Sequence, residues 1–551
     1  MTGSQYVAEA LRSAGITHVF FVPVVLTPAL AEMDRLGITG VMTHGEKAAV
    51  YMADGYARAS HKPGVCMAQT IGAANLAAGL RDPYLACSPV IAITGGPSPE
   101  HRHRHVYQEI DDFPLFEPLT RFNARIEMVE RLPDLLAQAF RSATTPCPGP
   151  VHLEIAGHFG QAADGGDLSN PVLPLTTNVP PFRPPAESGH VDRAVRLLQE
   201  AERPILVAGG GVAISGAQRE VVELAERLQI PVATSLNAKG TIKENHRLSV
   251  GVTGSYSRDC ANQAVAEADL IFFVGSRTGS QVTNFWRIPK PTARVIQLDI
   301  MSEELGRHYA NLVSLWGDAK TVLQQILDAA SGQSRTREGW LKRVDQLVER
   351  WRNEVEPLRR SEAVPMRPER ICRELQEALP SDAILVSETG HAGIWTGTHL
   401  ELHHAGQTYL RAAGSLGWGL PAALGAKCAC PGRPVVCFSG DGGFYYHISE
   451  LETAVRYGIN TVTIVNNNRS LSQETLLFAQ AYGGQQLSGF KMWQFEPMNL
   501  ARIAEAFGCY AERVEEPRQI GPSLERALAS GRPAVLDVVS DIKALAPDPW
   551  S

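Results

Sequence analysis

Short hydrophobic runs alternate with amphipathic segments in three successive stretches of the chain. The runs are rich in Val, Ile and Phe and are bounded by Gly, Pro and polar residues, as buried strands are. The runs that we expect to be strands are HVFFV, GVCMA, PVIAIT and GPVHLEI in the first stretch, PILVAGGGVAISG, LIFFVG and ARVIQLDI in the second, and AILVSE, PVVCFSGDG, NTVTIVNNN and PAVLDVV in the third. Strands that alternate with helical patterns are typical of parallel α/β sheets.

Two segments of different composition separate these stretches. Residues 166–189 are rich in proline, which neither continues a helix nor fills a strand, so we expect a surface linker there. Residues 331–365 are charged and have a helical pattern, and we expect a helical connector. The sequence therefore predicts three Rossmann-like, doubly wound α/β domains, at residues 1–165, 190–330 and 366–551. A chain of 551 residues is long enough for several hydrophobic cores.

The composition is that of an ordinary globular protein and disfavours several kinds of partner. Hydrophobic residues make up 44% of the chain and charged residues 20%. The formal net charge of −7 includes no polybasic run, so nucleic acid and anionic membranes are poor partners. No apolar stretch approaches membrane-spanning length, and the N-terminal segment lacks the pattern of a secretory signal. The nine cysteines are scattered through mostly apolar segments, so we expect a cytoplasmic protein with reduced thiols.

Polar residues with metal-binding chemistry follow two predicted strands of the third domain. The sequence SGDGGF, residues 439–444, follows the run PVVCF, and Asn466, Asn467 and Asn468 follow TVTIV. Two parallel strands joined by one right-handed crossover end side by side, so Asp441 and Asn468 can share a ligand. A carboxylate and an amide oxygen suit Mg²⁺, and the glycines let the backbone approach a diphosphate. Each motif alone is also a common turn or loop, so the pair carries the prediction.

Together these motifs resemble those of the thiamine diphosphate enzymes, in which Gly-Asp-Gly anchors the cofactor and Asn-Asn follows the next strand. The resemblance covers nearly the whole chain. It implies an N-terminal pyrimidine-binding (Pyr) domain, a middle domain and a C-terminal diphosphate-binding (PP) domain, with thiamine diphosphate and Mg²⁺ as cofactors. The residues that it assigns to Mg²⁺ are Asp441, Asn468 and Ser470, the last through its main-chain carbonyl, and Gly442 and Gly443 would lie at the diphosphate.

The N-terminal segment THGEKAA, followed by MADGYAR, resembles the pyrimidine-binding domain of the same enzymes. The glutamate that hydrogen-bonds a pyrimidine nitrogen of the cofactor corresponds to Glu46. We expect its carboxyl to lie in an apolar pocket, where it can share a proton with that nitrogen and so promote loss of the cofactor's C2 proton. Without the C-terminal motifs, Glu46 would be interpreted as a solvated residue in the first turn of a helix.

Two further segments of the third domain resemble cofactor-binding loops. Residues 413–421, AGSLGWGLP, resemble the family's GxMGxGLP stretch. The resemblance implies that the Gly414 carbonyl receives the cofactor's exocyclic amine and that Leu416 separates its two rings. The segment ETGHA matches the loop that wraps the diphosphate, and it assigns cofactor contacts to Gly390, His391 and Ala392. For His391, an ordinary loop position is an equal alternative.

Within the superfamily the chain is most similar to the acetolactate synthase branch. The similarity rests on Gly95-Gly96, on Tyr107-Gln108-Glu109 and on the segment GGGVAISGA. It implies that Gln108 faces the reactive end of the cofactor; bridging of loop backbones is the alternative. It also implies a homodimer or homotetramer with active sites at the subunit interface, where Glu46 comes from one subunit and Asp441 and Asn468 from another.

Several positions depart from the acetolactate synthase pattern and weaken the prediction of the acceptor. Pro23-Val24-Val25 replaces Pro-Gly-Gly, Gln281 replaces an arginine that grips the acceptor carboxylate, and Leu477 lies near the position of a tryptophan that favours 2-ketobutyrate. The departures also leave FAD open, with its absence favoured. The loop HRHRH, residues 101–105, can attract an anionic substrate, although we favour a surface loop or a subunit contact.

We therefore expect decarboxylation of a 2-keto acid, pyruvate or a close relative, followed by carboligation to an acceptor. One alternative is a carbon–carbon lyase of the 2-hydroxyacyl-CoA lyase or oxalyl-CoA decarboxylase type, although the terminal DIKALAPDPWS offers few basic residues for CoA. Another is a non-catalytic cofactor-binding homologue, which the intact Glu46, Asp441 and Asn468 disfavour. The sequence leaves open the donor, the acceptor and the choice between dimer and tetramer.

Overall fold

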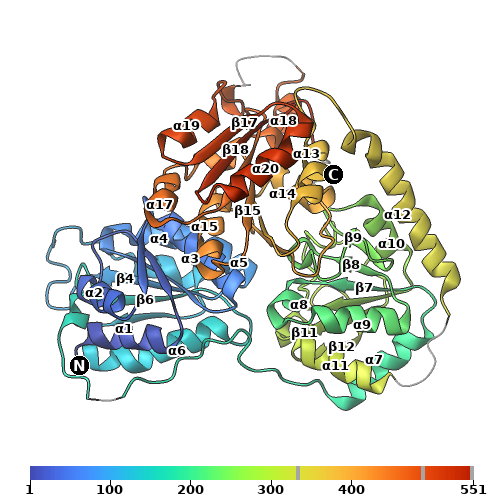
Figure 1. The fold of residues 1–551 in the computed structure, drawn as a ribbon. Helices are drawn as coiled ribbons and strands as arrows, with labels where there is room; N and C mark the ends of the chain where they lie inside the picture. Colours follow the sequence, from blue (N-terminus) through green and yellow to red (C-terminus); the bar gives the residue numbers. More distant parts are fainter. Residues whose placement is uncertain (170, 331–335, 485–490, 547–551) are drawn as a thin grey trace.

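A computed structural model of the chain describes residues 1–169, 171–330, 336–484 and 491–546. The described residues form three six-stranded sheets in which neighbouring strands are parallel. Helices cover both faces of each sheet, and Figure 1 shows the three units as a triangle, with the C-terminal unit above the other two. The predicted fold class is confirmed.

The first sheet has the strand order β2-β1-β3-β4-β6-β5. Its strands are β1 (His18–Phe21), β2 (Thr39–Met42), β3 (Gly64–Ala68), β4 (Val90–Gly96), β5 (Asn123–Ile126) and β6 (Val151–Ala156). Its helices are α1 (Gly3–Ser13), α2 (Thr27–Arg35), α3 (Glu46–Ser60), α4 (Ala73–Gly79), α5 (Arg81–Ala86) and α6 (Leu132–Thr144). One hydrophobic cluster joins α1, α2 and α6 to one face of the sheet, so α3 and α4 cover the other.

The middle sheet has the strand order β12-β11-β10-β7-β8-β9, which is the order of dinucleotide-binding sheets. Its strands are β7 (Pro204–Ala208), β8 (Val232–Thr234), β9 (Ser249–Val252), β10 (Leu270–Val274), β11 (Val295–Asp299) and β12 (Asn311–Trp316). Its helices are α7 (Ser188–Glu200), α8 (Gly210–Ser215), α9 (Gln218–Leu228), α10 (Asp259–Glu267) and α11 (Ala319–Ala329). The middle sheet therefore differs in topology from the other two.

The third sheet has the strand order β14-β13-β15-β16-β18-β17. Its strands are β13 (Ile384–Ser387), β14 (Thr408–Arg411), β15 (Val435–Gly440), β16 (Val462–Asn467), β17 (Tyr510–Val514) and β18 (Ala534–Val539). Its helices are α13 (Pro368–Ala378), α14 (His391–Thr398), α15 (Gly419–Ala429), α16 (Asp441–Tyr445), α17 (Glu450–Tyr457), α18 (Thr475–Ala481), α19 (Leu500–Ala506) and α20 (Ile520–Ala529). The helix α16 begins directly at Asp441, the aspartate of the predicted metal site.

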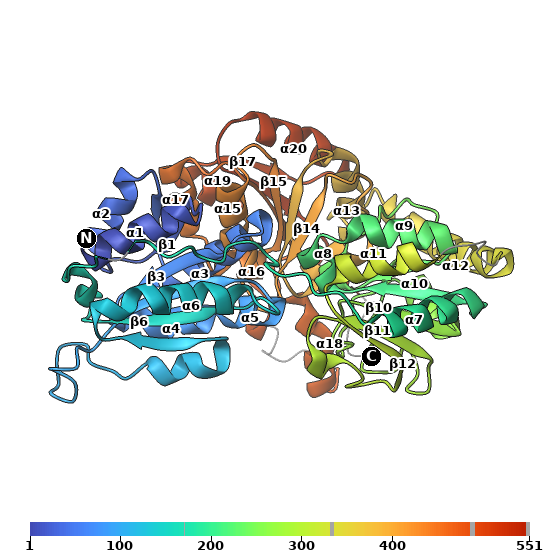
Figure 2. The ribbon, with the colours of Figure 1, turned by 90° about the horizontal axis from the view of Figure 1, so that it is seen from below.

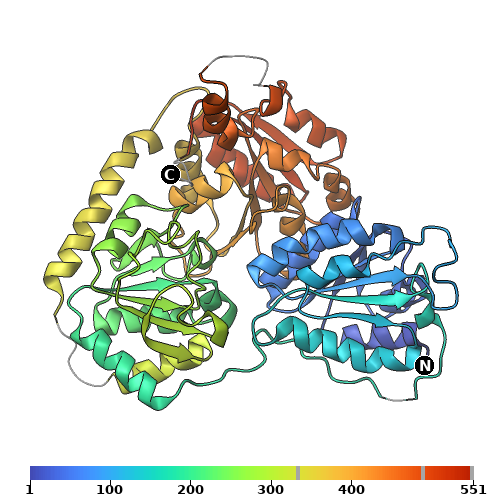
Figure 3. The same cartoon turned by 180° about the vertical axis from the view of Figure 1, so that it is seen from behind.

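The connections between the sheets are a long coil and a long helix. Residues 171–187 form neither helix nor strand and run from the first unit to the second, as Figure 2 shows from below. The helix α12 (Glu338–Arg359) flanks the middle unit on the way to the third, along the left edge of Figure 3. Residue 170, within the predicted linker, and residues 331–335, at the start of the predicted connector, lie outside the described residues, and the domain boundaries remain predictions.

The first and third sheets share one topology and meet through equivalent helices. In both, the order along the sheet is second, first, third, fourth, sixth, fifth strand. A Cβ at Gly55 of α3 would lie 2.0 Å from the Ala422 carbonyl oxygen, and one at Gly425 of α15 would lie 1.8 Å from that of Met52. Gly55 thus faces Ala422, which lies three residues before Gly425. Gly425 in turn faces Met52, which lies three residues before Gly55. One hydrophobic core contains α3, α4, α15 and strands of both sheets.

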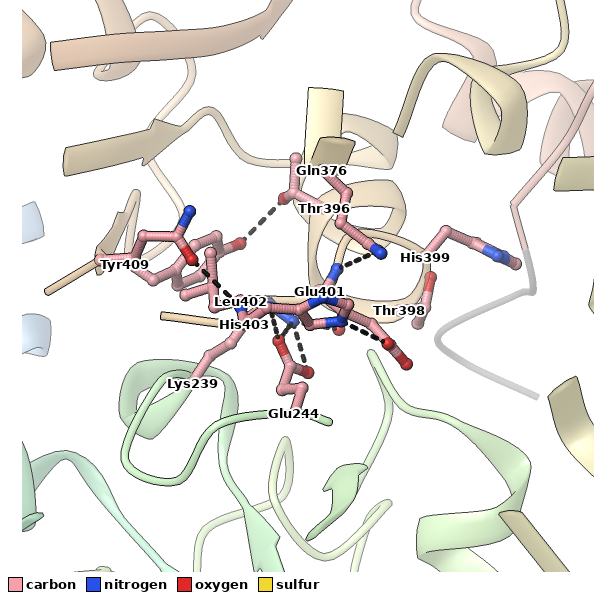
Figure 4. Close-up of polar contacts among 12 residues, drawn as sticks. Lys239, Glu244, Gln376, Thr396, Thr398, His399, Glu401, Leu402, His403 and Tyr409 are labelled. Carbon is pink, nitrogen blue, oxygen red and sulfur yellow. Dashed lines mark hydrogen bonds and ion pairs between the residues drawn. The ribbon is translucent and has the colours of Figure 1, made fainter. Parts of the chain in front are cut away.

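A buried ionic network joins the middle and third units. The Lys239 ammonium lies 2.6 Å from Glu244, whose carboxylate also accepts from the Arg258 guanidinium at 3.0 Å and from the Leu402 backbone N–H at 2.8 Å. Figure 4 shows Lys239 and Glu244 facing the segment that contains Thr398, Glu401 and Tyr409. Because all these charges are paired, the network holds the two units together without an isolated buried charge.

None of the described helices is both long enough and apolar enough to cross a membrane. The nine cysteines are free thiols, and all but Cys87 and Cys430 are buried. The prediction of reduced cysteines in apolar surroundings agrees with this arrangement.

Candidate active site

The predicted metal residues lie at the carboxyl ends of two neighbouring strands. Strands β15 and β16 pair in parallel, with Gly440 opposite Asn466. Asp441 follows β15 directly and Asn468 follows β16, so both reach the same edge of the sheet. The structure therefore brings together the two side chains that the sequence predicts to share a ligand.

Asp441 has an oxygen that no described residue satisfies. Its side chain is 1% exposed, its Oδ1 accepts from the Gly442 backbone N–H at 2.9 Å, and its Oδ2 has no hydrogen-bond partner among the described residues. Burial raises the pKa of this carboxyl to about 7. The Oδ1 of Asn466 at the end of β16 is likewise buried and unsatisfied within the described chain. A buried carboxylate oxygen without a donor fits a hard cation such as Mg²⁺.

Asn468 and Ser470 bond to each other. The Asn468 Oδ1 accepts from the Ser470 backbone N–H at 3.1 Å and from the Ser470 hydroxyl at 3.0 Å. The Asn468 amide donates to the Ser472 hydroxyl at 3.1 Å. All three residues are buried. A cation bound by Asn468 would replace the hydrogen bonds that Ser470 makes to this oxygen.

Two glycines of the GDGG motif are packed so closely against other side chains that a larger residue would not fit. A Cβ at Gly442 would lie 2.4 Å from Leu471, and one at Gly443 would lie 2.6 Å from the Glu388 side chain. Gly390 has φ 66° and ψ −147°, a conformation that only glycine adopts easily, and it places the first turn of α14 at the edge of the sheet. These positions form a smooth backbone cradle at the amino ends of α14 and α16.

A cavity of about 380 Å³, here called the PP cavity, joins these groups. Its walls include most of the residues that the sequence assigns to the cofactor, namely Gly390, His391, Ala392, Gly414, Leu416, Gly442, Gly443, Asn468 and Ser470. Tyr256, Gln281 and Arg411 close it from other segments. The His391 Nδ1 lies 2.8 Å from the Ser472 hydroxyl, and burial lowers its pKa to about 4. The His391 ring is therefore neutral at pH 7 and can donate or accept without carrying charge.

Glu388 organises the loops around the PP cavity, a role that the sequence did not reveal. Its buried carboxylate accepts from the backbone N–H groups of Thr389 at 3.0 Å, Gly417 at 3.2 Å and Gly419 at 2.7 Å. Burial raises its pKa to about 7. The segment ETGHA includes Glu388, but the sequence assigns it no contact. Its role could not be identified locally because it binds loops that lie far apart in the sequence.

Glu46 lies apart from the PP cavity in the single chain. It is the first residue of α3, and its Oε2 accepts from the Asn75 amide at 3.2 Å. A Cβ at Gly72 would lie 2.4 Å from its Oε1, so this glycine makes room for the carboxyl. The side chain is half-exposed rather than enclosed by apolar groups, contrary to expectation. The described residues therefore do not enclose the Glu46 carboxyl.

Gln108 also lies away from the described PP cavity walls. It has φ 64° in the loop after β4, where Tyr107 is 80% exposed. The neighbouring loop His101–His105 is tied down by an Arg102–Glu127 ion pair of 2.8 Å and by backbone N–H groups that donate to Glu109. The cationic loop therefore lies on the surface of the chain, in agreement with the interpretation that we favoured.

Two further cavities adjoin the middle unit. One of about 520 Å³, here the middle cavity, lies at the carboxyl ends of β7, β10, β11 and β12 and contacts Gly209, Arg277 and Asp299. The other, of about 940 Å³ and here the junction cavity, lies between all three units and contacts Arg58, Lys239 and Tyr409. Two of the positions that depart from the acetolactate synthase pattern can be placed. Gln281 lines both the middle cavity and the PP cavity. Val24 is exposed on the surface of the first unit.

Comparison with known proteins identifies the three units. Residues 1–115 match the N-terminal TPP binding domain of thiamine pyrophosphate enzymes, residues 191–326 the central domain, and residues 388–538 the C-terminal TPP binding domain. The last match includes every residue of the strand-end cluster around Asp441.

Three relatives that match over most of their length are named acetolactate synthases. The chain is 33% identical to a probable acetolactate synthase large subunit of Methanocaldococcus jannaschii, over 98% of this chain and 92% of the relative. It is 32% identical to an acetolactate synthase of Arthrospira platensis, over 98% and 94% of the two chains. It is 30% identical to the acetolactate synthase isozyme 2 large subunit of Escherichia coli K12, over 98% and 96%. The chain belongs to the thiamine pyrophosphate enzyme family and is acetolactate synthase-like.

Proposed function

We propose that this protein decarboxylates a 2-keto acid and joins the remaining carbon unit to an acceptor, with thiamine diphosphate and Mg²⁺. The observation that carries the proposal is the unsatisfied Asp441 Oδ2, because both chain neighbours of Asp441, Gly440 and Gly442, line the PP cavity. The names of the relatives, acetolactate synthases, support this reaction class. Thiamine diphosphate supplies a carbon nucleophile that adds to the keto carbon and accepts the electrons left when CO₂ departs.

The PP cavity has the groups that a diphosphate and its cation need. Asp441, Asn468 and the Ser470 carbonyl would hold Mg²⁺, and the backbone N–H groups at Gly390–Ala392 would bind phosphate oxygens at the start of α14. The neutral His391 ring adds a hydrogen bond and no charge. Glu388 accepts hydrogen bonds from the loop that contains Gly417 and Gly419, so this part of the binding site is formed before the cofactor binds.

Glu46 would hold or move a proton at a pyrimidine nitrogen, and Gln108 would face the reacting carbon. Both lie outside the described PP cavity walls of their own chain. We therefore propose a homodimer or homotetramer in which Glu46 of one subunit completes the cavity of another. Exclusion of water by such an interface would supply the apolar cover that Glu46 lacks alone.

FAD is not part of the proposed cofactor set. Decarboxylation followed by carbon–carbon bond formation transfers no electrons to an external acceptor, so the chemistry does not require a flavin. The middle cavity is where a dinucleotide would bind, because ligands of such sheets lie beyond the carboxyl strand ends. An acyl-CoA substrate and a non-catalytic role have no specific observation in their favour.

The proposal is tested by incubating the purified protein with thiamine diphosphate, Mg²⁺ and pyruvate and following the mixture by proton NMR. We expect consumption of pyruvate and formation of acetolactate or acetoin, and no consumption without cofactor or with excess EDTA. If pyruvate is untouched, a panel of other 2-keto acids is tested in the same way. A protein that binds the cofactor saturably and consumes no 2-keto acid would contradict the proposal.

A further inference from the structure

Two of the nine cysteines, Cys87 and Cys147, line a cavity and are here called the thiol pair. Both contact the middle cavity, and Cys87 contacts the junction cavity as well. None of the other seven cysteines lines any of the three cavities named above. Burial raises the thiol pKa of six of those seven, which makes them poor nucleophiles. The thiol pair is therefore the place where a small molecule can meet cysteine chemistry.

The thiol pair is brought together by the fold of the first unit. Cys87 follows α5 directly, and Cys147 lies in the connection between α6 and β6. The two side chains are hydrogen-bonded to each other. Contact between two thiols is the first requirement for a disulfide between them, and here both thiols belong to one unit.

Two arginines without a carboxylate partner lie beside the thiol pair. Arg277, in the loop after β10 of the middle unit, has its Nη2 3.4 Å from the Cys147 sulfur. Arg121 of the first unit stacks on the Tyr84 ring at 5.2 Å, and its Nε is unsatisfied among the described residues. Asp299 lines the same cavity but makes no ion pair with Arg277. The described residues therefore offer these guanidinium groups sulfur and no carboxylate to compensate their charge.

These surroundings make Cys87 the better nucleophile of the two. The hydrogen bond from Cys147 lowers the pKa of the Cys87 thiol; burial opposes this effect, and the charges of Arg277 and Arg121 add to it. The same hydrogen bond and burial raise the pKa of Cys147. A thiolate beside a second thiol, with cations close by, has the parts of a reactive dithiol: one sulfur attacks and the other resolves.

We propose that Cys87 and Cys147 are a redox-active pair that a low-molecular-weight disulfide converts into an intramolecular disulfide. The Cys87 thiolate attacks one sulfur of the small disulfide, whose S–S bond breaks, and the first small thiolate leaves. Cys147 then gives up its proton to that thiolate and attacks the Cys87 sulfur, and the second small thiolate leaves. Two protein thiols are thus oxidised by two electrons, and one small disulfide is reduced to two thiols.

The cavity favours a small disulfide that carries carboxylates, because Arg277 and Arg121 attract negative charge. Glutathione disulfide is of this class. The inference does not depend on the proposed function.

Oxidation of the thiol pair would also change a contact between two units. Arg277 belongs to the middle unit and Cys147 to the first, and the guanidinium donates to the Cys147 sulfur. A disulfide carries no charge and is a weak acceptor, so this hydrogen bond would weaken. The oxidation state of the thiol pair would therefore alter how the first unit holds the wall of the middle cavity.

The test uses the full-length protein, reduced and then freed of reductant without air, with glutathione disulfide in excess as the probe. At timed points the remaining thiols are blocked by alkylation in denaturant, and the digested protein is mapped by mass spectrometry. We expect the loss of two of the nine free thiols, a disulfide that links the Cys87 and Cys147 peptides, and recovery of both thiols with dithiothreitol.

Variants separate the two steps. Cys147→Ser should stop the reaction after the first step, with one glutathione bound to Cys87, and Cys87→Ser should prevent the disulfide. Arg277→Gln should slow the exchange at pH 6 by about threefold for each unit by which the pKa of Cys87 rises, because a thiolate fraction about tenfold smaller is partly offset by a more nucleophilic sulfur. Cys430→Ser changes the other cysteine that is only partly buried, and this matched control should form the disulfide as the wild type does.

Two results would overturn the inference: retention of all nine thiols in the folded wild type, or a lasting glutathione adduct on Cys87 while Cys147 stays free. A disulfide between Cys87 and Cys147 that forms only in denaturant would overturn it as well. Arg277→Gln that reacts as fast as the wild type contradicts the role given to Arg277. The melting temperature checks that each variant folds; if a serine variant does not, the peptide map of the wild type alone decides.

Discussion

The Asp441 carboxyl changes charge in the range where the enzyme would work. Its pKa is raised to about 7 by burial, against an ordinary value of 3.8, so the metal-free protein holds the proton up to near neutrality. This contributes stability that is complete below pH 3.8 and is lost as pH rises through about 7. Glu388 titrates in the same direction and range. A cation bound by Asp441 would replace the proton.

The first prediction concerns the pH dependence of Mg²⁺ binding. Below pH 7 the metal must displace the Asp441 proton, so the affinity should fall about tenfold for each pH unit and should level off above pH 7. The measurement is Mg²⁺ titration by calorimetry, with thiamine diphosphate present, between pH 6 and 8. An affinity that does not change between pH 6 and 7 would show that Asp441 is not a ligand.

The second prediction concerns Glu46. Glu46→Gln keeps the size of the side chain but removes the ability to hold a proton, so turnover should fall about 10²-fold or more. Thiamine diphosphate binding, measured by calorimetry, should stay within a few-fold of wild type, and exchange of the cofactor's C2 proton should slow. Glu452→Gln is the control, because Glu452 contacts the neighbouring His44 at 2.7 Å and has no proposed role. Unchanged turnover in Glu46→Gln would refute the assignment.

Residues with local motifs were predictable from the sequence, whereas residues defined by tertiary contacts were not. Asp441 and Asn468 follow strands within recognisable motifs, and the structure places them together. Glu388 stands in the segment ETGHA, but that motif does not indicate its contacts, and Arg411 stands in no motif. Glu388 matters through backbone groups about thirty positions away, and Arg411 through its place in the PP cavity wall. Neither property can be seen before the chain is folded.

At the scale of elements, the contact between α3 and α15 depends on two glycines. The third prediction is that Gly425→Ala destabilises the protein, because its Cβ would lie 1.8 Å from the Met52 carbonyl oxygen and neither backbone can move alone. Overpacking of this kind costs about 1–3 kcal/mol or more. Gly189→Ala, in α7, is the control, because a Cβ there meets nothing within 4 Å and alanine favours a helix. In thermal unfolding, Gly425→Ala should have a lower melting temperature than Gly189→Ala. Equal melting temperatures would mean that α3 and α15 can move apart without loss of stability.

The strands that escaped the sequence analysis are edge strands, with one exception. The six edge strands are β2, β5, β9, β12, β14 and β17, and none of them was expected. Several have partly exposed residues, as in β5 and β17, so they lack the continuous hydrophobic run of a central strand. The exception, β8, is three residues long. All the other central strands were expected, and most of them are buried along their whole length.

At the scale of the whole molecule, the ionic network of Figure 4 fixes the middle unit to the third. The fourth prediction is that Glu244→Gln destabilises this junction by about 3–5 kcal/mol, because Lys239 and Arg258 would keep buried charges without their shared carboxylate. Glu223→Gln breaks a surface pair with Arg227 and should cost less than about 1 kcal/mol. Thermal unfolding and limited proteolysis measure the difference. Equal effects would show that the network does not bear on stability.

The fifth prediction concerns a shared active site. If Glu46 of one chain serves Asp441 of another, a mixed dimer of Glu46→Gln and Asp441→Ala chains contains one site with both residues intact. Random pairing of the two inactive variants should therefore restore about a quarter of wild-type activity. The measurement is turnover after co-expression, with each variant alone as the control. No recovery in a proven mixed dimer would place both residues in one chain.

The reciprocal contact of Gly55 and Gly425 limits how chains can assemble. In a self-complementary contact, two equivalent surfaces bind each other, and once they are paired neither is free to bind a third. Here both members belong to one polypeptide, with Gly55 against Ala422 and Gly425 against Met52. Both surfaces of this pair, on α3 and on α15, are therefore already occupied within one chain. No second molecule can extend it into a ring or a fibre, and any union between chains must use surfaces other than the crossing of α3 and α15.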